Sequence, residues 1–489
     1  MKVRRVPFYV RTGVVTSFVA ILFGLDTGSI GPVTSMPSFK STVGSFSATI
    51  HGVIVSAILI PGAITALVAG ALAHRFGHAK VIALGSLIYG IGAAVECGAP
   101  SLGGFIFGRL VKGVGNGLFL SNVFVQVSEI SPARVRGVMT ALPQFITVLG
   151  IVIGYFICYG ASRLGDSSSS WRIPPGIASG LGLLLSGTYW LTPPSPRWLV
   201  SRGRVTEAYD MAKRLGFEQD EQDELLGHSM TSDPAEEANS LTLYDALYLT
   251  LVEFREAFSH SFRGRTAFGC FLLGMQQFSG IDGVLYYAPV LFTQAGLSGD
   301  QATFLASGVS AITMLAVTIP ATLFADHWGR RISSIIGGIL ITALMLVMGS
   351  LYAANVVSTT SGAGRWVVIV SIYLFAITYS CTWAISFRTF LVESLPRKTR
   401  SSASSLAQSC NWVANYIVAL ITPILISKTL FGVYYLFAFC SLLCTVIVSL
   451  YMVETKGLSL EAIEQRHTER QSGAMEESTT IVRYGAAVK

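Results

Sequence analysis

Apolar runs of about twenty residues recur along nearly the whole chain, with short polar stretches between them. A helix of about that length crosses a hydrocarbon core of roughly 30 Å. We therefore predict an all-helical membrane protein with twelve spans. The spans are expected at Val14–Ile30, Val53–Ala73, Val81–Ala99, Leu102–Val125, Val138–Tyr159, Ile173–Leu191, Ala267–Leu291, Ala302–Phe324, Ile332–Ala353, Trp366–Phe390, Leu406–Ile426 and Val433–Val453.

Two motifs occur once in each half of the chain. The pattern E-x-x-P-x-x-x-R is found at Glu129–Arg136 and again, 264 residues later, at Glu393–Arg400. A weaker repeat relates His74–Gly77 to Asp326–Gly329, 252 residues further on. The similar offsets indicate two halves of six spans each in the same order. One large class of secondary transporters is built in this way, with its binding site between the halves.

Composition excludes a soluble protein, because only 12% of the residues are charged and 52% are hydrophobic. Cations gather before the first span and then in every second loop, at Lys2–Arg11, Arg134–Arg136, Arg197–Arg265, Arg330–Arg331 and Arg397–Arg400. The positive-inside rule places both termini and the long middle loop in the cytoplasm. The net charge of +7 follows from this topology and gives no reason to expect a nucleic-acid partner.

The chain divides into four predicted parts: an N-terminal six-helix half at residues 1–192, a cytoplasmic linker at 193–265, a C-terminal six-helix half at 266–453 and a cytoplasmic tail at 454–489. The linker shows helical periodicity in three stretches, Arg204–Leu215, Asp220–Leu226 and Tyr244–Phe258, around a loose polar connector at Asp233–Ser240. The first span is expected to serve as its own targeting signal, because no polar boundary or cleavage site ends it. The seven cysteines have no metal-ligand or redox spacing and are expected to be apolar core residues.

Ionisable residues also occur inside predicted spans, where a charge is costly and therefore suggests a function. Asp26 lies in the first span, and Arg109 opens the fourth, with Lys112 one helical turn further on. An aspartate that holds an arginine when ionised and releases it when protonated is a minimal proton-coupled switch. The alternative is a static buried pair that only locks two helices together. Gly113 and Gly117 share a face of the same helix and are expected to let another helix approach closely.

The seventh span gathers amides, a carboxylate and phenols around glycines. Gln276 and Gln277 precede Gly280, and Asp282 and Tyr286 follow it. Side-chain amides both donate and accept hydrogen bonds, which suits a polyhydroxylated ligand. The glycines are expected to break this helix at the middle of the membrane. The alternative is that the amides, including Gln144 in the fifth span, only tie helices together.

The chain resembles the sugar porter family of the major facilitator superfamily, in its fungal type, from Phe23 to Glu464. The motifs that carry the resemblance are Gly24–Gly28, Gly108–Arg109, Glu129–Gly137, Ser195–Leu199, Gln276–Gln277 with Gly280 and Tyr286–Tyr287, Asp326 with Gly329–Arg331, Glu393–Arg400, Asn411–Trp412 with Asn415, and Glu454–Glu461. The resemblance implies the major facilitator fold, alternating access, and hexoses or polyols as cargo. It also implies a sugar site that includes Gln144, Gln276, Gln277, Tyr286 and Asn411, and a proton-coupling pair of Asp26 and Arg109.

Several positions depart from the family pattern. The usual Asp-Arg-x-Gly-Arg-Arg after the second span reads His74–Ala79, Gln126 stands where a tyrosine is usual, and Pro194 where a glutamate is usual. Three departures fall at the expected sugar site: Asp282, Met314 and Arg388. An isolated arginine at mid-membrane is very unfavourable, so Asp282 and Arg388 are expected to pair and to belong to the binding site. The alternative is that Tyr286 or water holds Asp282, which would leave Arg388 free to bind a carboxylate or phosphate of the solute.

We therefore expect a plasma-membrane carrier that moves a small polyhydroxylated solute, with proton symport by alternating access. Its partners are the solute, protons and the bilayer, and no cofactor or metal is expected. A cytoplasmic gate of ion pairs between the halves is expected from Arg75, Glu129, Arg136, Arg330, Arg331, Glu393 and Arg400. Alternatives are a carrier of an acidic polyol, an organic acid or an exported metabolite, and a nutrient sensor built on a transporter fold. An enzyme is not expected, because no nucleophile-base or metal grouping lies outside the spans.

Overall fold

The computed structural model describes residues 6–165, 167–227, 243–260, 262–297, 300–324, 328–357, 362–396, 399–429 and 431–456. The expected connector at Asp233–Ser240, the tail beyond Lys456, and Asp326 of the weaker repeat lie outside these residues. The described part of the chain is helical throughout and contains no strand.

The N-terminal half consists of α1 (Phe8–Phe18), α2 (Ile21–Ser35), α3 (Pro37–Val43), α4 (Ala48–Ser56), α5 (Leu59–Phe76), α6 (His78–Gly98), α7 (Leu102–Glu129), α8 (Arg136–Ser162) and α9 (Ser168–Ser186). The linker contains α10 (Pro196–Ser201), α11 (Val205–Leu215), α12 (Gln219–Gly227) and α14 (Leu243–Ala257). The last three helices coincide with the three periodic stretches of the sequence, so these linker helices are confirmed.

The C-terminal half consists of α15 (Arg263–Phe278), α16 (Ile281–Gln294), α17 (Asp300–Phe324), α18 (Arg330–Ala353), α19 (Gly364–Cys381), α20 (Trp383–Ser394), α21 (Arg400–Lys428) and α22 (Gly432–Tyr451). Within the described residues, nine helical segments are long and apolar enough to cross a membrane. Several of them join two helices across a short interruption, such as α1 with α2 and α4 with α5. With α9, the α15–α16 pair and α17, they account for the twelve predicted spans.

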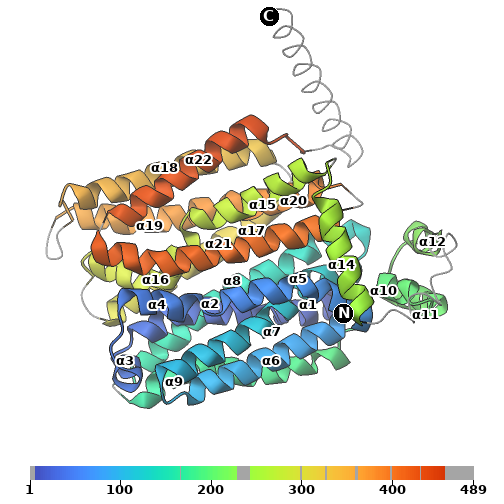
Figure 1. The fold of residues 1–489 in the computed structure, drawn as a ribbon, viewed down its shortest axis with the longest axis horizontal. Coiled ribbons are helices and arrows are strands. Elements are labelled where there is room, and N and C mark those ends of the chain that lie inside the picture. The colour runs from blue at the N-terminus through green and yellow to red at the C-terminus, as the bar shows by residue number, and fades with distance from the viewer. Residues whose placement is uncertain are drawn as a thin grey trace, which may run out of the picture.

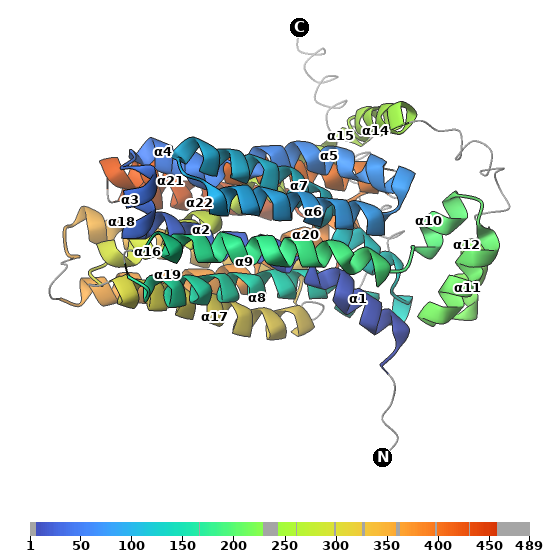
Figure 2. The ribbon, with the colours of Figure 1, turned by 90° about the horizontal axis from the view of Figure 1, so that it is seen from below.

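The long helices run side by side in two groups (Figure 1). Helices α1 to α9 form one group and α15 to α22 the other, and the linker helices α10 to α12 lie together at one end of the bundle (Figures 1 and 2). We call this end the linker face and the other end the opposite face. The chain therefore has the two six-helix halves that its internal repeat predicts.

Two spans of the C-terminal half are broken in their middle. Gly280 separates α15 from α16 with a φ of 89°, a conformation that favours glycine because it has no Cβ. Thr382, with φ −120° and ψ −84°, separates α19 from α20. The break at Gly280 was expected from the sequence, and the break at Thr382 was not.

The two halves pack on each other through α16 on α2, α21 on α4 and α5, and α17 on α8. Glycines permit the closest approaches. A Cβ at Gly31 of α2 would lie 1.9 Å from the carbonyl oxygen of Tyr286, and one at Gly52 of α4 would lie 2.4 Å from that of Leu420. These contacts close the interface between the halves toward the opposite face.

Small residues also set the packing within the N-terminal half. A Cβ at Gly113 of α7 would lie 2.3 Å from the carbonyl oxygen of Ile58, and one at Gly117 would lie 2.3 Å from that of Gly62. The expected close approach of another helix to this face is therefore confirmed, and α5, with Ile58 just before its first residue, provides it.

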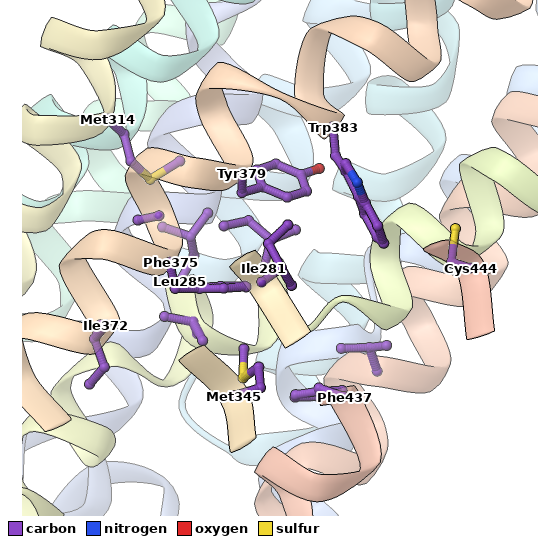
Figure 3. Close-up of a cluster of buried hydrophobic side chains, with 14 of the residues drawn as sticks. Ile281, Leu285, Met314, Met345, Ile372, Phe375, Tyr379, Trp383, Phe437 and Cys444 are labelled. Atoms are coloured by element: carbon purple, nitrogen blue, oxygen red, sulfur yellow. The ribbon is translucent and has the colours of Figure 1, made fainter. Parts of the chain in front are cut away.

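An apolar cluster fills the interior of the C-terminal half (Figure 3). It includes Ile281 and Leu285 of α16, Met345 of α18 and Phe375 of α19. Met314 of α17, one of the departures from the family pattern, belongs to this cluster and is 5% exposed. Its thioether fills apolar space where an amide would need hydrogen-bond partners.

Gly280→Ala should destabilise the protein, because a positive φ costs a residue with a Cβ about 1–3 kcal/mol. That Cβ would also lie 2.3 Å from Phe437 Cδ2. Thermal unfolding of the detergent-purified protein measures the loss. Gly274→Ala is the matched control, since this glycine lies within α15 with no atom within 4 Å of the added Cβ. Equal unfolding temperatures for the two variants would contradict the role given to Gly280.

Candidate functional site

Asn411 of α21 connects the two glutamines that precede the break in the seventh span. Its Nδ2 donates to the carbonyl oxygen of Leu273 at 2.8 Å and lies 3.4 Å from Gln276 Oε1. Its Oδ1 accepts a hydrogen bond from Gln277 Nε2 at 3.2 Å. Gln276 Nε2 donates to the carbonyl oxygen of Trp383, the residue that opens α20, at 3.0 Å. The amides thus meet where both broken spans are interrupted.

Asn415 lies one turn further along α21 and hydrogen-bonds to two residues that follow the break at Gly280. Its Nδ2 donates to Asp282 Oδ2 at 2.5 Å and to the phenol oxygen of Tyr286 at 3.3 Å. We call the six residues of these two networks the central polar cluster: Gln276, Gln277, Asp282, Tyr286, Asn411 and Asn415. Five of the predicted substrate-binding residues are therefore brought together, and Asn415 joins them.

Two acceptors of the central polar cluster have no partner within the described chain. Gln277 Oε1 and Asn415 Oδ1 are buried and accept no hydrogen bond. A buried acceptor without a donor costs about 1–3 kcal/mol, and a hydroxyl group brought to it would remove that cost. The cluster therefore offers acceptors for hydroxyl donors, although its other amide groups do tie helices together as the alternative interpretation held.

Gln144 is not joined to the central polar cluster by any described hydrogen bond. It lies half-buried on α8 and donates to no other described residue. The Gln144 amide therefore makes no hydrogen bond to another described side chain, and the assignment of Gln144 to a sugar site stays a prediction.

The predicted ion pair between Asp282 and Arg388 is not formed. No nitrogen of Arg388 lies within 4.0 Å of the Asp282 carboxylate, although the two charges still influence each other through space. The Asp282 carboxylate accepts a hydrogen bond from Asn415 instead. Arg388 lies half-buried on α20 and donates no hydrogen bond to another described residue. The pair is absent because the amide of Asn415 already binds the Asp282 carboxylate, a contact that the sequence did not indicate.

Asp26 and Arg109 do meet, as predicted. Arg109 Nη1 and Nη2 bind Asp26 Oδ1 and Oδ2, each at 3.2 Å, and Nη2 also donates to the carbonyl oxygen of Val55 at 3.0 Å. A bidentate pair of this kind fixes both the distance and the orientation of the two groups. Asp26 is 4% exposed and Arg109 is fully buried.

Two further charges complete this group. Lys112 Nζ donates to Asp26 Oδ1, and it also donates to Glu96 Oε2 at 2.5 Å. Glu96 Oε1 in turn lies 3.5 Å from Arg109 Nη1. We call Asp26, Glu96, Arg109 and Lys112 the charge quartet. Glu96 was missed from the sequence, although a carboxylate inside a predicted span was the signal that could have found it.

The predicted gate residues pair within their own half or with the linker. Glu129 accepts from Ser195 Oγ at 2.5 Å and lies 3.7 Å from His78 Nε2, while Arg136 lies 3.7 Å from Glu221 of α12. Arg75 contributes only its carbonyl oxygen, which accepts from Arg202 at 2.5 Å.

The C-terminal half repeats this arrangement. Arg330 Nη2 donates to Glu393 Oε1 at 2.9 Å, and Thr455 Oγ1 donates to Glu393 Oε2 at 2.5 Å. Arg331 donates to the carbonyl oxygen of Ser449 at 2.7 Å. The side chain of Arg400 lies outside the described residues. Across the described chain, no ion pair joins the halves at the linker face, and the gating role of these residues stays a prediction.

Two broken spans around amides, with two parallel six-helix halves, define a membrane transporter of the major facilitator fold. The structure is similar to that of the xylose transporter XylE of E. coli. A structure of this proton:xylose symporter with 6-bromo-6-deoxy-D-glucose matches with a TM-score of 0.73 and 24% identity, over 94% of this chain and 98% of that one.

The sequence profile of the family described as "Sugar (and other) transporter" matches residues 12–467, and the chain belongs to this family. Its members are transporters and not enzymes. The chain is 26% identical to the high-affinity glucose transporter of Kluyveromyces lactis, over 93% of this chain and 84% of that protein. It is 29% identical to the glucose transporter GlcP of Staphylococcus epidermidis, over 93% and 96%.

The Arg330–Glu393 pair should contribute to stability more than an exposed pair does. Its side chains are 9% and 23% exposed, whereas those of Arg204 and Glu207 are 48% and 58% exposed. Glu393→Gln should therefore lower the free energy of unfolding by about 1–3 kcal/mol, whereas Glu207→Gln should change it little, because solvent screens an exposed pair. Thermal unfolding in detergent compares them. An equal effect of the two substitutions would contradict this ranking.

Proposed function

We propose that this protein is a secondary-active carrier that moves a sugar across a membrane together with protons, by alternating access. The observation that carries the proposal is the central polar cluster, with its two unpartnered acceptors at the breaks of two spans. The names of the relatives, which include glucose transporters and a proton:xylose symporter, support a sugar as the cargo rather than an acidic polyol or an exported metabolite.

The cluster suits a polyhydroxylated solute because each hydroxyl group both donates and accepts. Gln277 Oε1 and Asn415 Oδ1 would accept from the solute. The free amide of Gln144 and the guanidinium of Arg388 would donate to it. A ligand that satisfies these groups binds without leaving buried polar atoms unpaired.

The conformation supports an inward-facing state. The contacts of Gly31 and Gly52 close the interface toward the opposite face, while no described ion pair joins the halves at the linker face. The positive-inside rule assigns the linker face to the cytoplasm. In the outward-facing state, the gate residues of the two halves would exchange their present partners for one another. Residence in the plasma membrane is part of this proposal.

Uptake into proteoliposomes tests the proposal. Labelled glucose, xylose, a sugar alcohol and a sugar acid are offered separately at two external pH values. Concentrative uptake of a neutral sugar that increases as the external pH falls is expected. Transport of the sugar acid alone would contradict a neutral sugar as the cargo, and uptake without any dependence on pH would contradict the coupling to protons.

Asp26→Asn should abolish accumulation against a gradient, because an amide is always neutral and cannot exchange a proton. Exchange of labelled for unlabelled sugar should persist. Counterflow and proton-driven uptake in the same proteoliposomes measure the two properties. Asp26→Asn protein that still concentrates sugar in response to a pH gradient would show that Asp26 is not the proton carrier.

Arg388→Gln should weaken sugar binding, because it removes a cationic donor at the proposed site. We expect KM for the sugar to rise by about tenfold, the equivalent of roughly 1.4 kcal/mol. Arg365→Gln is the matched control, since this arginine lies at the start of α19 beside Trp366. Unchanged KM in Arg388→Gln would remove Arg388 from the binding site.

A further inference from the structure

The charge quartet contains one carboxylate and one cation more than a proton-coupling pair needs. Each of its four side chains is at most 4% exposed. They come from three helices: Asp26 from α2, Glu96 from α6, and Arg109 and Lys112 from α7. With two carboxylates and two cations, the group is electrically neutral when all four are ionised.

Protonation of Asp26 removes one of the two negative charges. Lys112 and Arg109 would then both depend on Glu96, which already contacts Lys112 Nζ at 2.5 Å and Arg109 Nη1 at 3.5 Å. Without Glu96, two cations would surround a neutral carboxyl group in an apolar interior, which is strongly unfavourable. Without Lys112, Asp26 would lose one of the cations that favour its ionised form.

We propose that Glu96 and Lys112 are positioning residues that set the pH at which Asp26 takes up the transported proton. Glu96 holds the two cations while Asp26 is neutral, and Lys112 holds Asp26 ionised until the external pH is low enough. The inference rests on the proposed proton symport.

The other titratable groups near the quartet are phenols and one thiol, with two groups one contact further away. These are Arg172 of α9, which donates to the carbonyl oxygen of Cys97, and His51 of α4, whose ring lies 5.1 Å from that of Tyr287. Lys112 Nζ lies 5.4 Å from the centroid of the Tyr89 ring, and the Tyr89 hydroxyl donates to the carbonyl oxygen of Leu22 at 2.8 Å. The remaining neighbours are Tyr286 and Tyr287 of α16 and Cys97 of α6. The phenols and the thiol carry no charge at neutral pH, so the charges that contact Asp26 directly are those of Arg109 and Lys112.

The quartet is also connected to the contact between α2 and α16 that closes the interface between the halves toward the opposite face. The carbonyl oxygen of Tyr286 contacts Gly31, five residues after Asp26 on α2. Tyr286 also binds Asn415 in the central polar cluster. A change of charge at Asp26 therefore acts on the helix that both closes the interface and contributes to the sugar site.

The pH midpoint of sugar accumulation in proteoliposomes tests the assignment. Removing a neighbouring unit charge at this distance should move the midpoint by more than about one pH unit. Glu96→Gln removes a negative charge and should lower the midpoint, whereas Lys112→Met removes a positive charge and should raise it. The double variant restores neutrality and should return the midpoint to within about half a unit of the wild type.

Matched controls are Glu207→Gln and Lys80→Met, which change exposed residues outside the quartet and should leave the midpoint unchanged. Counterflow at constant pH shows whether each variant is folded and active. If Glu96→Gln does not fold, Lys112→Met and the double variant still decide the question, because each has its own predicted midpoint.

Midpoints that stay at the wild-type value in active variants would overturn this assignment and leave proton symport intact. A wild-type protein that performs counterflow but shows no pH dependence would overturn both the symport and the assignment. Opposite shifts in the single variants, cancelled in the double variant, are the result that supports it.

Discussion

The N-terminal half depends on one constraint: the charges buried in its apolar interior must cancel one another. Asp26, Glu96, Arg109 and Lys112 are each unfavourable alone in an apolar interior, and together they form a closed set of ion pairs across α2, α6 and α7. The glycines of α7 let α5 come close, and Arg109 donates to the backbone of Val55 on α4. Packing and charge pairing therefore fix the same helices, and a proton is the smallest ligand that changes their balance.

The C-terminal half is organised differently, around breaks in its spans. Gly280 and Thr382 interrupt two helices. Gln276 donates to the carbonyl oxygen of Trp383, the first residue of α20, and Asn411 donates to that of Leu273 within α15. The polar residues of this half therefore gather beside the two breaks, next to α16, which also closes the interface between the halves.

The sequence predicted the fold well because length, hydropathy and internal repeat are properties of single helices. The twelve spans, the break at Gly280 and the meeting of Asp26 with Arg109 were all expected. The contact of Asn415 with Asp282 depends on how α21 crosses α16, which no local pattern encodes. Glu96 lies near the end of its predicted span, where a carboxylate is usually at the membrane surface. The gate pairs were predicted from repeated motifs, but their partners depend on which conformation the halves adopt. Thr382 breaks its span without a glycine or proline to indicate it.

The central claim is that sugar and proton cross the membrane together, with the proton carried by a neutral group of buried charges. The most direct measurement is the null point of flux in proteoliposomes, where opposing sugar and pH gradients are varied until net movement stops. The account predicts one proton per sugar, so that each pH unit balances an opposing sugar gradient of about tenfold when the membrane potential is clamped at zero. Net flux that stops only when the sugar concentrations are equal on both sides, whatever the pH gradient, would contradict it.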